Sequence, residues 1–434
     1  MIIDLADIYE KLDDLEIIEY TGKVTKIVGL TIEATGPEVN IGDLCLIEGS
    51  KSTVPAEVVG FRDGAVLFMP LGGMDGIGPG NIVKSVGQTL SVSVGEDMVG
   101  RVLDGLGRPM DSLGEFETKQ RYPVINQAPS PLTRDRISEP LGLGVKVLDG
   151  LLTVGKGQRV GIFAGSGVGK STLMGMIARN TTAQVNVIAL IGERGREVRE
   201  FIERDLGKEG LKRSVVVVAT SEQPAMVRLK GAFVATAIAE FFRDKGKDVL
   251  LFMDSLTRFA MAQREIGLAA GEPPVSRGYT PSVFALLPGL LERAGNSDKG
   301  SITALYTVLV DGDDLTEPVT DAARGTLDGH IVLSRDLANK SQYPAVDVLA
   351  SVSRLMNEIV TDEHKKSAVK FRRILATFRE SEDLINIGAY NKGSNKDIDD
   401  AIKMIGKIKQ FINQEVTEVF TFEQTAKMLE EVFG

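Results

Sequence analysis

Five short, nearly continuous apolar runs alternate with helical segments between residues 158 and 314, and this alternation limits the fold more than any other feature. The runs are "QRVGIFAG", "VNVIALIGE", "SVVVVATS", "VLLFMDS" and "ITALYTVLVDGDD". The segments between them are "STLMGMIARN", "REVREFIERDLG", "PAMVRLKGAFVATAIAEFFRDKG" and "LTRFAMAQREIG". Strands that are apolar on both sides suit a parallel sheet covered by helices on both faces. We therefore predict an α/β core, in which the charged helix from Arg196 to Leu206 is a solvated face.

The regions on either side of this core have different patterns. From Gly22, the runs "KVTKIVGLTIEA", "DLCLIEG", "AEVVGF" and "AVLFMP" predict a small antiparallel β-barrel or sandwich that ends near residue 90. After about residue 357 strand signals end, and "KKSAVKFRRILATFRES", "DIDDAIKMIGKIKQFINQ" and "TFEQTAKMLEEVF" predict a small helical domain. Leu5, Ile8, Leu12 and Leu15 line one face of a helix over residues 2–18, which either docks on its own domain or binds a partner. The predicted division is 1–18, 19–90, 91–356 and 357–434.

Composition excludes several classes of protein. The net charge of −10 comes from 60 acidic and 50 basic residues spread along 434 residues, which argues against a nucleic-acid surface as the main feature. A single cysteine, Cys45, excludes an internal disulfide framework, and two histidines leave little for a zinc site, so we expect a reducing cytoplasm. No apolar run approaches the roughly 20 residues of a membrane span, and the start "MIIDLADIYEKLDDLE" is acidic where a signal peptide is basic. Any membrane contact is expected to be peripheral.

The stretch "AGSGVGKS", residues 164–171, lies between a predicted strand and a predicted helix. Its glycines let successive N–H groups point inward toward anionic oxygens at a helix start. Lys170 supplies a charge to the β- and γ-phosphates, and the Ser171 hydroxyl can ligate Mg²⁺. The usual G-x-x-x-x-G-K-[ST] pattern begins with glycine, whereas this chain has Ala164. The predicted nucleotide-phosphate site comprises Ala164, Gly165, Ser166, Gly167, Val168, Gly169, Lys170, Ser171 and Thr172.

Two acidic residues directly follow other predicted strands. Ligands gather at the carboxyl edge of a parallel sheet, so such residues are candidates for holding the metal and the attacking water. Asp254 ends "VLLFMD" and is placed to hold Mg²⁺ through a water, although an apolar run plus an aspartate is weak by itself. Glu193 ends "VIALIGE", where its carboxylate can polarise water for attack on the γ-phosphate. The alternative for Glu193 is an acid that interacts with a helix dipole.

With "AGSGVGKS", "GERGREVREF" and "MDSLTRFAMAQREIG", the chain resembles the RecA-type rotary ATPases, and most closely the type III protein-export ATPases. The likeness covers nearly everything after about residue 20, and "GRVLDGLGRPMD", "EPPVSRGYTPSVFALLPGLLERAG" and "YPAVDVLASVSRLM" belong to it. It implies a RecA-like P-loop core with ATP and Mg²⁺ as ligands. Near the C-terminus, "ESEDLINIGAYNKGS" resembles the export ATPases, and the acidic "DELSEED" loop of ATP-synthase catalytic subunits is absent. Flagellar export ATPases are the first choice and virulence-injectisome ATPases the second.

The resemblance also implies roles for individual residues around the γ-phosphate. Glu193 in "GERGRE" matches the catalytic glutamate of the family. Arg194 beside it would lie near the γ-phosphate, and Glu197 would orient water bound to the metal. Arg258 in "DSLTRF" would be a further cation on the phosphate side.

Two further matches concern the base and the neighbouring subunit. Tyr343 in "QYPAVD" matches the aromatic residue on which adenine stacks; without the resemblance it is a half-buried loop tyrosine. Arg354 in "ASVSRLM" matches the arginine finger that enters the neighbouring subunit's site; the sequence alone describes a surface cation. A finger that acts in trans makes activity depend on a ring, which the family implies to be a homohexamer.

The resemblance implies partners as well. The barrel would form a collar above the motor domains, and the segment 1–18 would dock a stator-like regulator of the export apparatus. The C-terminal helices would face a central stalk protein, export chaperones and the membrane export gate, with exported proteins as substrates. The chain would work in the cytoplasm, peripherally at the inner face of the cell membrane when docked, and without nucleic acid.

Three other classes of protein share this core. A rotary ATP-synthase catalytic subunit is disfavoured by the C-terminal loop. A non-catalytic nucleotide-binding subunit lacks a carboxylate at the position of Glu193 and cannot activate water. An RNA translocase needs basic and aromatic residues interleaved on its binding surface, and "KVTKIVGLTIEATGPEVNIGDLCLIEG" offers few.

Overall fold

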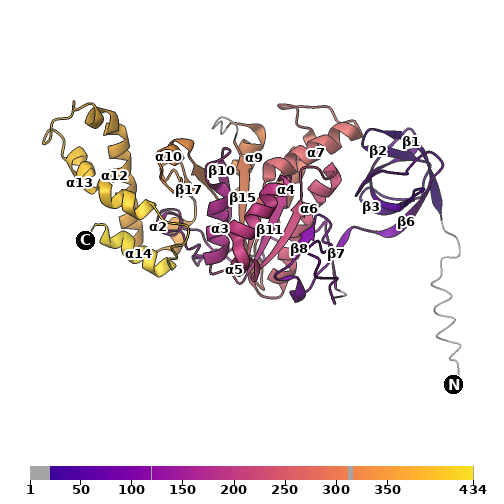
Figure 1. Ribbon diagram of the computed structural model, residues 1–434, viewed down its shortest axis with the longest axis horizontal. Coiled ribbons are helices and arrows are strands. Elements are labelled where there is room, and N and C mark those ends of the chain that lie inside the picture. The colour runs from indigo at the N-terminus through magenta and orange to yellow at the C-terminus, as the bar shows by residue number, and fades with distance from the viewer. Residues whose placement is uncertain (1–19, 119, 311–315, 434) are drawn as a thin grey trace, which may run out of the picture. The chain divides into compact units, whose positions relative to one another are not determined.

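The computed structural model describes residues 20–118, 120–310 and 316–433 (Figure 1). The predicted amphipathic helix over residues 2–18 lies outside them. The described chain divides into two compact units, each considered by itself below. The first holds the residues up to Leu90 together with Ile266–Glu272, and the second holds the rest.

In the first unit, six strands of the described chain close into an antiparallel barrel in the order β1-β2-β5-β4-β3-β6. The strands are β1 (Thr21–Val28), β2 (Thr31–Ala34), β3 (Asp43–Glu48), β4 (Thr53–Arg62), β5 (Ala65–Pro70) and β6 (Ile82–Thr89). Alternate apolar side chains, among them Val24, Ile32 and Phe68, fill the interior. The predicted barrel is confirmed. Its strand β6 lies outside the apolar runs from which the barrel was predicted.

In the second unit, nine strands of the described chain form one sheet, with the path β17-β16-β10-β15-β13-β11-β12-β8 and β14 beside β15. All pairs are parallel except those of β14 and β17. The strands are β8 (Val102–Asp104), β10 (Arg159–Ala164), β11 (Val185–Ile191), β12 (Ser214–Ala219), β13 (Asp248–Asp254), β14 (Gly295–Asn296), β15 (Ser301–Leu309), β16 (Gly329–Leu333) and β17 (Val352–Ser353). The predicted parallel core is confirmed.

Helices cover both faces of this sheet. Leu173 and Ile177 share one apolar cluster with Ile188, whose side chain points to that face of β11. On the opposite face, the helix over residues 225–244 packs closely on β11. A Cβ atom added at Gly231 of this helix would lie 3.1 Å from Ile191 Cδ1. The helices of this region are α3 (Lys170–Asn180), α4 (Gly195–Glu200), α5 (Gly207–Leu211), α6 (Ala225–Asp244), α7 (Leu256–Ala270), α8 (Pro281–Glu292), α9 (Pro318–Thr326) and α10 (Arg335–Asn339).

The charged helix predicted from Arg196 to Leu206 is not one regular helix. It begins as α4 and continues as a π-helical segment, η2 (Phe201–Leu206), that buries Phe201 and Leu206. Exposed arginines of α4 pair with acids one turn later, Arg196 with Glu200 at 2.8 Å. The solvated charged face is therefore present, but the burial of two apolar residues accompanies a wider helical turn.

The remaining strands of the second unit are short. Strands β8, β16 and β17 have only two to five residues, too few for a periodic signal. A separate two-stranded ladder pairs β7 (Ser91–Ser93) with β9 (Arg121–Pro123). A short 3-10 helix, η1 (Glu96–Met98), lies between them in the chain.

The C-terminal helices confirm the predicted helical region. They are α11 (Met356–Ile359), α12 (Asp362–Asn386), α13 (Lys396–Ile412) and α14 (Phe422–Glu431), and α12, α13 and α14 pack on α2 (Lys146–Leu151). Thr361, Asn395 and Thr421 cap the last three through their side chains. These helices and the central sheet form one compact unit, so the predicted boundary near residue 357 stays a prediction. Within the described ranges, no helix is both long and apolar enough to cross a membrane.

Candidate nucleotide-binding and catalytic site

The loop 165–169 joins the end of β10 to the start of α3, as the phosphate-site prediction requires. Ala164 is the last strand residue and is buried, and its carbonyl accepts a hydrogen bond from Val310 N. Only Gly167 and Gly169 have a positive φ in this fully described loop, +78° and +89°. Alanine therefore fits the first position of the motif, since that residue continues the strand and needs no special conformation.

The loop ends at a helix start that faces Tyr343. Gly169 is the N-cap of α3, and no side chain of the described residues caps it. The N–H groups of the first turn thus have no intrahelical acceptor and favour an anion. A methyl group at Gly169 would lie 3.6 Å from Cε1 of Tyr343, whose side chain is 48% exposed. The structure thereby places the predicted base platform beside the predicted phosphate loop.

Lys170, Asp254 and Glu193 come together at the carboxyl edge of the sheet, from α3 and from the ends of β13 and β11. Lys170 Nζ lies 2.5 Å from Asp254 Oδ1 and 3.6 Å from Glu193 Oε1. The three side chains are only 13%, 5% and 15% exposed. A buried cation and two carboxylates in contact form a polar centre in which each charge strongly affects the others.

The charges shift the protonation of this centre. The pKa of Glu193 is raised to about 7, first because the carboxyl is buried and second because Asp254 is near, while Lys170 opposes the shift. Glu197 shares a hydrogen bond with Glu193, and this bond lowers the pKa of Glu197. Burial lowers the pKa of Lys170, but Asp254 and Glu193 outweigh burial and raise it. A carboxyl group that titrates near neutral pH is suited to general-base catalysis.

We expect kcat/KM for ATP to fall about tenfold for each pH unit below the pKa of Glu193, about 7, because only the ionised carboxylate can accept a proton. The measurement is kcat/KM from pH 5.5 to 8.5, with ATP binding followed separately. The residual rate of the Glu193→Gln variant serves as control and should show no inflection near this pH. An identical inflection in that variant would assign the titration to another group.

The other predicted γ-phosphate residues are less enclosed. Arg194 is 79% exposed and pairs with Glu197 at 3.2 Å. Arg258, in the first turn of α7, lies against Gly192, the residue before Glu193. Its Nε is buried without a hydrogen-bond partner among the described residues. The structure brings these three beside the centre, while their assigned roles stay predictions.

The donor set suits Mg²⁺. The Ser171 hydroxyl follows Lys170 in α3, and Asp254 contributes a carboxylate, both oxygen donors of the kind Mg²⁺ prefers. No group of three or more His, Cys, Asp or Glu in the described ranges could hold a metal alone. Mg²⁺ usually takes one or two protein ligands and completes its shell with phosphates and waters, so the residues present fit it.

Thr307, which no motif in the sequence marks, contacts this centre. It lies on β15 and donates a hydrogen bond from Oγ1 to Asp254 Oδ1 at 2.6 Å, which orients the carboxylate toward Lys170. A buried hydroxyl within the apolar run "ITALYTVLV" was the available signal. A buried hydroxyl group needs a hydrogen-bond partner, and Asp254, at the end of the neighbouring strand β13, provides the acceptor.

Arg354 lies at the opposite edge of the sheet. The backbone N–H of Arg354 donates to the carbonyl of Asp328, the residue that directly precedes β16. The Asp328 carboxylate pairs at 3.0 Å with Arg159, the first residue of β10. The phosphate loop follows the last residue of β10. At about 3.3 Å per residue, the ends of this six-residue strand are about 16 Å apart. The structure thus does not bring Arg354 to the phosphate loop of its own chain.

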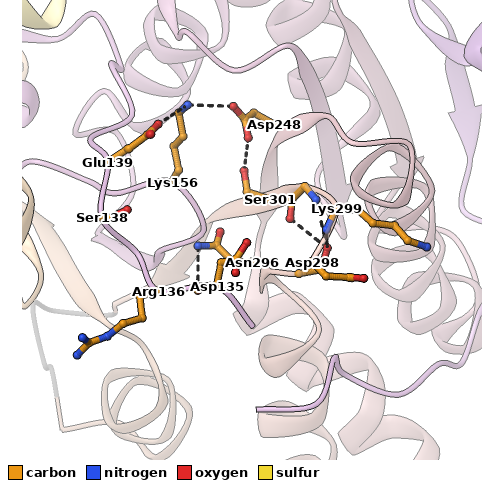
Figure 2. A pocket seen from close by; sticks show the side chains of 12 residues that line it. Asp135, Arg136, Ser138, Glu139, Lys156, Asp248, Asn296, Asp298, Lys299 and Ser301 are labelled. Carbon is orange, nitrogen blue, oxygen red and sulfur yellow. Dashed lines mark hydrogen bonds and ion pairs between the residues drawn. The ribbon is translucent and has the colours of Figure 1, made fainter. Parts of the chain in front are cut away.

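A polar cavity of about 210 Å³ also lies at this amino edge (Figure 2). Lys156 lies between Glu139, at 2.9 Å, and Asp248, at 3.2 Å, and these ion pairs satisfy its charge. No glycine loop leading into a helix lines it. The cavity therefore lacks the features of a phosphate site, and the nucleotide-binding assignment stays with the carboxyl edge.

Comparison with known proteins agrees with this geometry. The ATP synthase alpha/beta family matches in two parts, its nucleotide-binding domain at residues 144–353 and its beta-barrel domain at residues 24–87. The C-terminal domain described as "T3SS EscN ATPase" matches residues 360–431. The barrel, the core and the C-terminal helices are thus each matched separately.

Relatives match over the whole chain. The flagellum-specific ATP synthase of Bacillus subtilis is 56% identical, covering 100% of this chain and 97% of the relative. The type 3 secretion system ATPase of Xanthomonas euvesicatoria is 52% identical, covering 95% and 93%. The solved structure of the assembled ATPase EscN from enteropathogenic E. coli has a TM-score of 0.90 and 45% identity, covering 95% of this chain and 100% of that one. The chain therefore belongs to the ATP synthase alpha/beta family and, within it, is an ATPase of the type III protein-export branch.

Proposed function

We propose that this chain is the Mg-ATP-hydrolysing motor of a type III protein-export apparatus, and that the apparatus is flagellar. The observation that carries the enzymatic part is the contact of Lys170 with both Glu193 and Asp254 beside the phosphate loop. A passive nucleotide-binding subunit needs the loop and the lysine but has no use for a buried carboxyl group with a pKa near 7.

Each residue has a separate task in the proposed reaction. The N–H groups of the loop and Lys170 bind the phosphates of ATP and hold the γ-phosphate in place. Ser171 and Asp254 hold Mg²⁺, which when bound neutralises charge on the β- and γ-phosphates. Glu193, when ionised, accepts the proton of the attacking water, and Glu197 orients water bound to the metal. Arg194 and Arg258 add positive charge at the edge of the site.

The active form in this proposal is a homohexamer. Arg354 lies at the amino edge of the sheet, and it supports the γ-phosphate of a neighbouring copy whose carboxyl edge faces it. The relative EscN is known as an assembled ATPase and in complex with its central stalk EscO. By this likeness, the C-terminal helices contact a stalk protein, export chaperones and the membrane export gate. The segment 1–18 binds the regulator, which docks the cytoplasmic ring at the inner face of the membrane.

The flagellar assignment is supported by the relatives. Flagellum-specific proteins of Bacillus subtilis, Borreliella burgdorferi and Treponema pallidum cover 98% or more of this chain at 51% identity or more. Type 3 secretion system ATPases of Xanthomonas euvesicatoria and Sinorhizobium fredii are 52% and 51% identical and cover 95% and 93% of this chain. An injectisome ATPase is therefore the second candidate.

Expression of this chain in a Bacillus subtilis strain that lacks its own flagellum-specific ATPase tests the proposal. We expect flagellin export and swimming to return, because the relative is 56% identical over the whole chain. The Glu193→Gln chain, made at the same level, should fail. The injectisome candidate would be favoured by two results together. The chain would accumulate and hydrolyse ATP in Bacillus subtilis without forming flagella, and it would restore secretion in a Xanthomonas euvesicatoria strain that lacks its type 3 secretion ATPase.

A further inference from the structure

Gln414 joins the C-terminal helices to the loop that carries Tyr343. It lies in the link between α13 and α14, and its backbone N–H donates to the Tyr343 carbonyl at 3.0 Å. We propose that Gln414 is a positioning residue for nucleotide binding: it holds Tyr343 in place beside Gly169, so that the base can stack on the ring. The inference rests on the proposed role of Tyr343 as the base platform.

The side chain of Gln414 is fixed on three sides. Its Oε1 accepts from Lys146 N at 2.8 Å, and its Nε2 donates to the carbonyls of Gly144 at 2.9 Å and Glu418 at 3.0 Å. The residue is 5% exposed. An amide whose donors and acceptor are all used in a buried place has one orientation, and this orientation fixes its own backbone N–H.

The bonds join three separate parts of the chain. Gly144 and Lys146 precede or begin α2, which belongs to the core, whereas Glu418 belongs to the C-terminal link. The third part is the loop of Tyr343, whose ring lies against Gly169 of the phosphate loop. A displacement of the link is therefore transmitted through one backbone hydrogen bond to the residue beside the nucleotide.

Two ion pairs also join the C-terminal helices to this region, and both involve residues other than Tyr343. Arg379 on α12 pairs with Asp347 at 3.0 Å, and Lys340 pairs with Glu382 at 3.3 Å. Both pairs are partly exposed and hold residues before or after Tyr343 in the chain, which makes them weak restraints on its carbonyl. Gln414 is the buried contact, and it acts on Tyr343 directly.

The effect should be confined to binding of the base. Loss of the restraint leaves the phosphate loop, Lys170 and Glu193 in place, so turnover at saturating ATP is retained. Base stacking on an aromatic side chain changes affinity by about fivefold to about a hundredfold. We expect Gln414→Leu to raise the KM and the dissociation constant of ATP about tenfold, within that range.

The test compares ATP with inorganic tripolyphosphate, which has the phosphates but no base. Gln414→Leu and Gln414→Glu, which keeps an acceptor for Lys146 N but faces the carbonyls of Gly144 and Glu418 with a carboxylate oxygen, are measured alongside Gln410→Leu, an exposed glutamine one turn earlier. We expect weaker ATP binding in both Gln414 variants, with the inhibition constant of tripolyphosphate unchanged. Gln410→Leu should bind both ligands as the native chain does.

The Tyr343→Ala background separates this inference from the proposed function. If Gln414 acts through Tyr343, its substitution has no further effect on ATP affinity once the ring is absent. The inference is overturned if ATP affinity is unchanged in both Gln414 variants, if tripolyphosphate binding weakens equally, or if the effect persists without the ring. An unchanged ATP affinity in Tyr343→Ala alone would instead overturn the platform role of Tyr343.

Discussion

Substitution of Glu193 by glutamine is expected to lower the turnover number for ATP by about 10²- to 10⁴-fold, the usual effect of losing a general base. Glutamine keeps the size of the side chain but accepts no proton at neutral pH. It also removes one of the two carboxylates near Lys170, so binding of the anionic phosphates should persist or tighten slightly. The expected result is a chain that binds ATP without turning it over.

The measurements are steady-state hydrolysis and equilibrium binding of ATP with Mg²⁺. Glu200→Gln is a matched control, because Glu200 lies seven residues after Glu193, at the end of α4, and pairs with the exposed Arg196 at 2.8 Å. That variant should hydrolyse ATP normally. Normal turnover by the Glu193→Gln chain would show that Glu193 is not the general base. The role that distinguishes the chain from a non-catalytic nucleotide-binding subunit would then have no support.

Substitution of Arg354 by alanine is expected to lower the turnover number by about 10³- to 10⁵-fold, the range found for arginine fingers. The guanidinium neutralises charge on the transferred phosphoryl group, and the structure places it an entire strand length away from its own phosphate loop. The loss should appear in hydrolysis but not in assembly or ATP binding. Arg199→Ala, an exposed arginine paired with Glu203 at 2.8 Å, is the control and should remain active.

Mixing the two inactive chains tests whether the arginine acts in trans. In a mixed ring, an Arg354→Ala chain retains Glu193 and can receive Arg354 from a neighbouring Glu193→Gln chain. We expect the mixture to exceed the activity of both parents once subunits have exchanged. A mixture that never exceeds its parents, at concentrations where rings form, would show that the finger is not supplied by the neighbour.

The alternating apolar runs were enough to predict the parallel core, and the period of the C-terminal segments was enough to predict their helices. Long elements carry a periodic signal because each repeats its burial pattern several times. The short strands β16 and β17 carried no such signal, since a strand of two to five residues does not repeat its burial pattern. The π-helical segment within the charged helix was equally hidden, because it depends on how Phe201 and Leu206 pack.

The amino-acid sequence by itself determined the phosphate loop, since positive φ angles need glycine at 167 and 169 and the anion needs Lys170. It also placed Glu193 and Asp254 at strand ends. Only the tertiary structure decided that these carboxyl groups share one lysine, that Thr307 orients Asp254, and that Gln414 contacts Tyr343. It likewise decided that Arg354 lies at the far edge of the sheet. The physical reason is that pKa shifts, hydrogen bonds and reach depend on distances of a few ångströms between residues far apart in the chain, which no local pattern encodes.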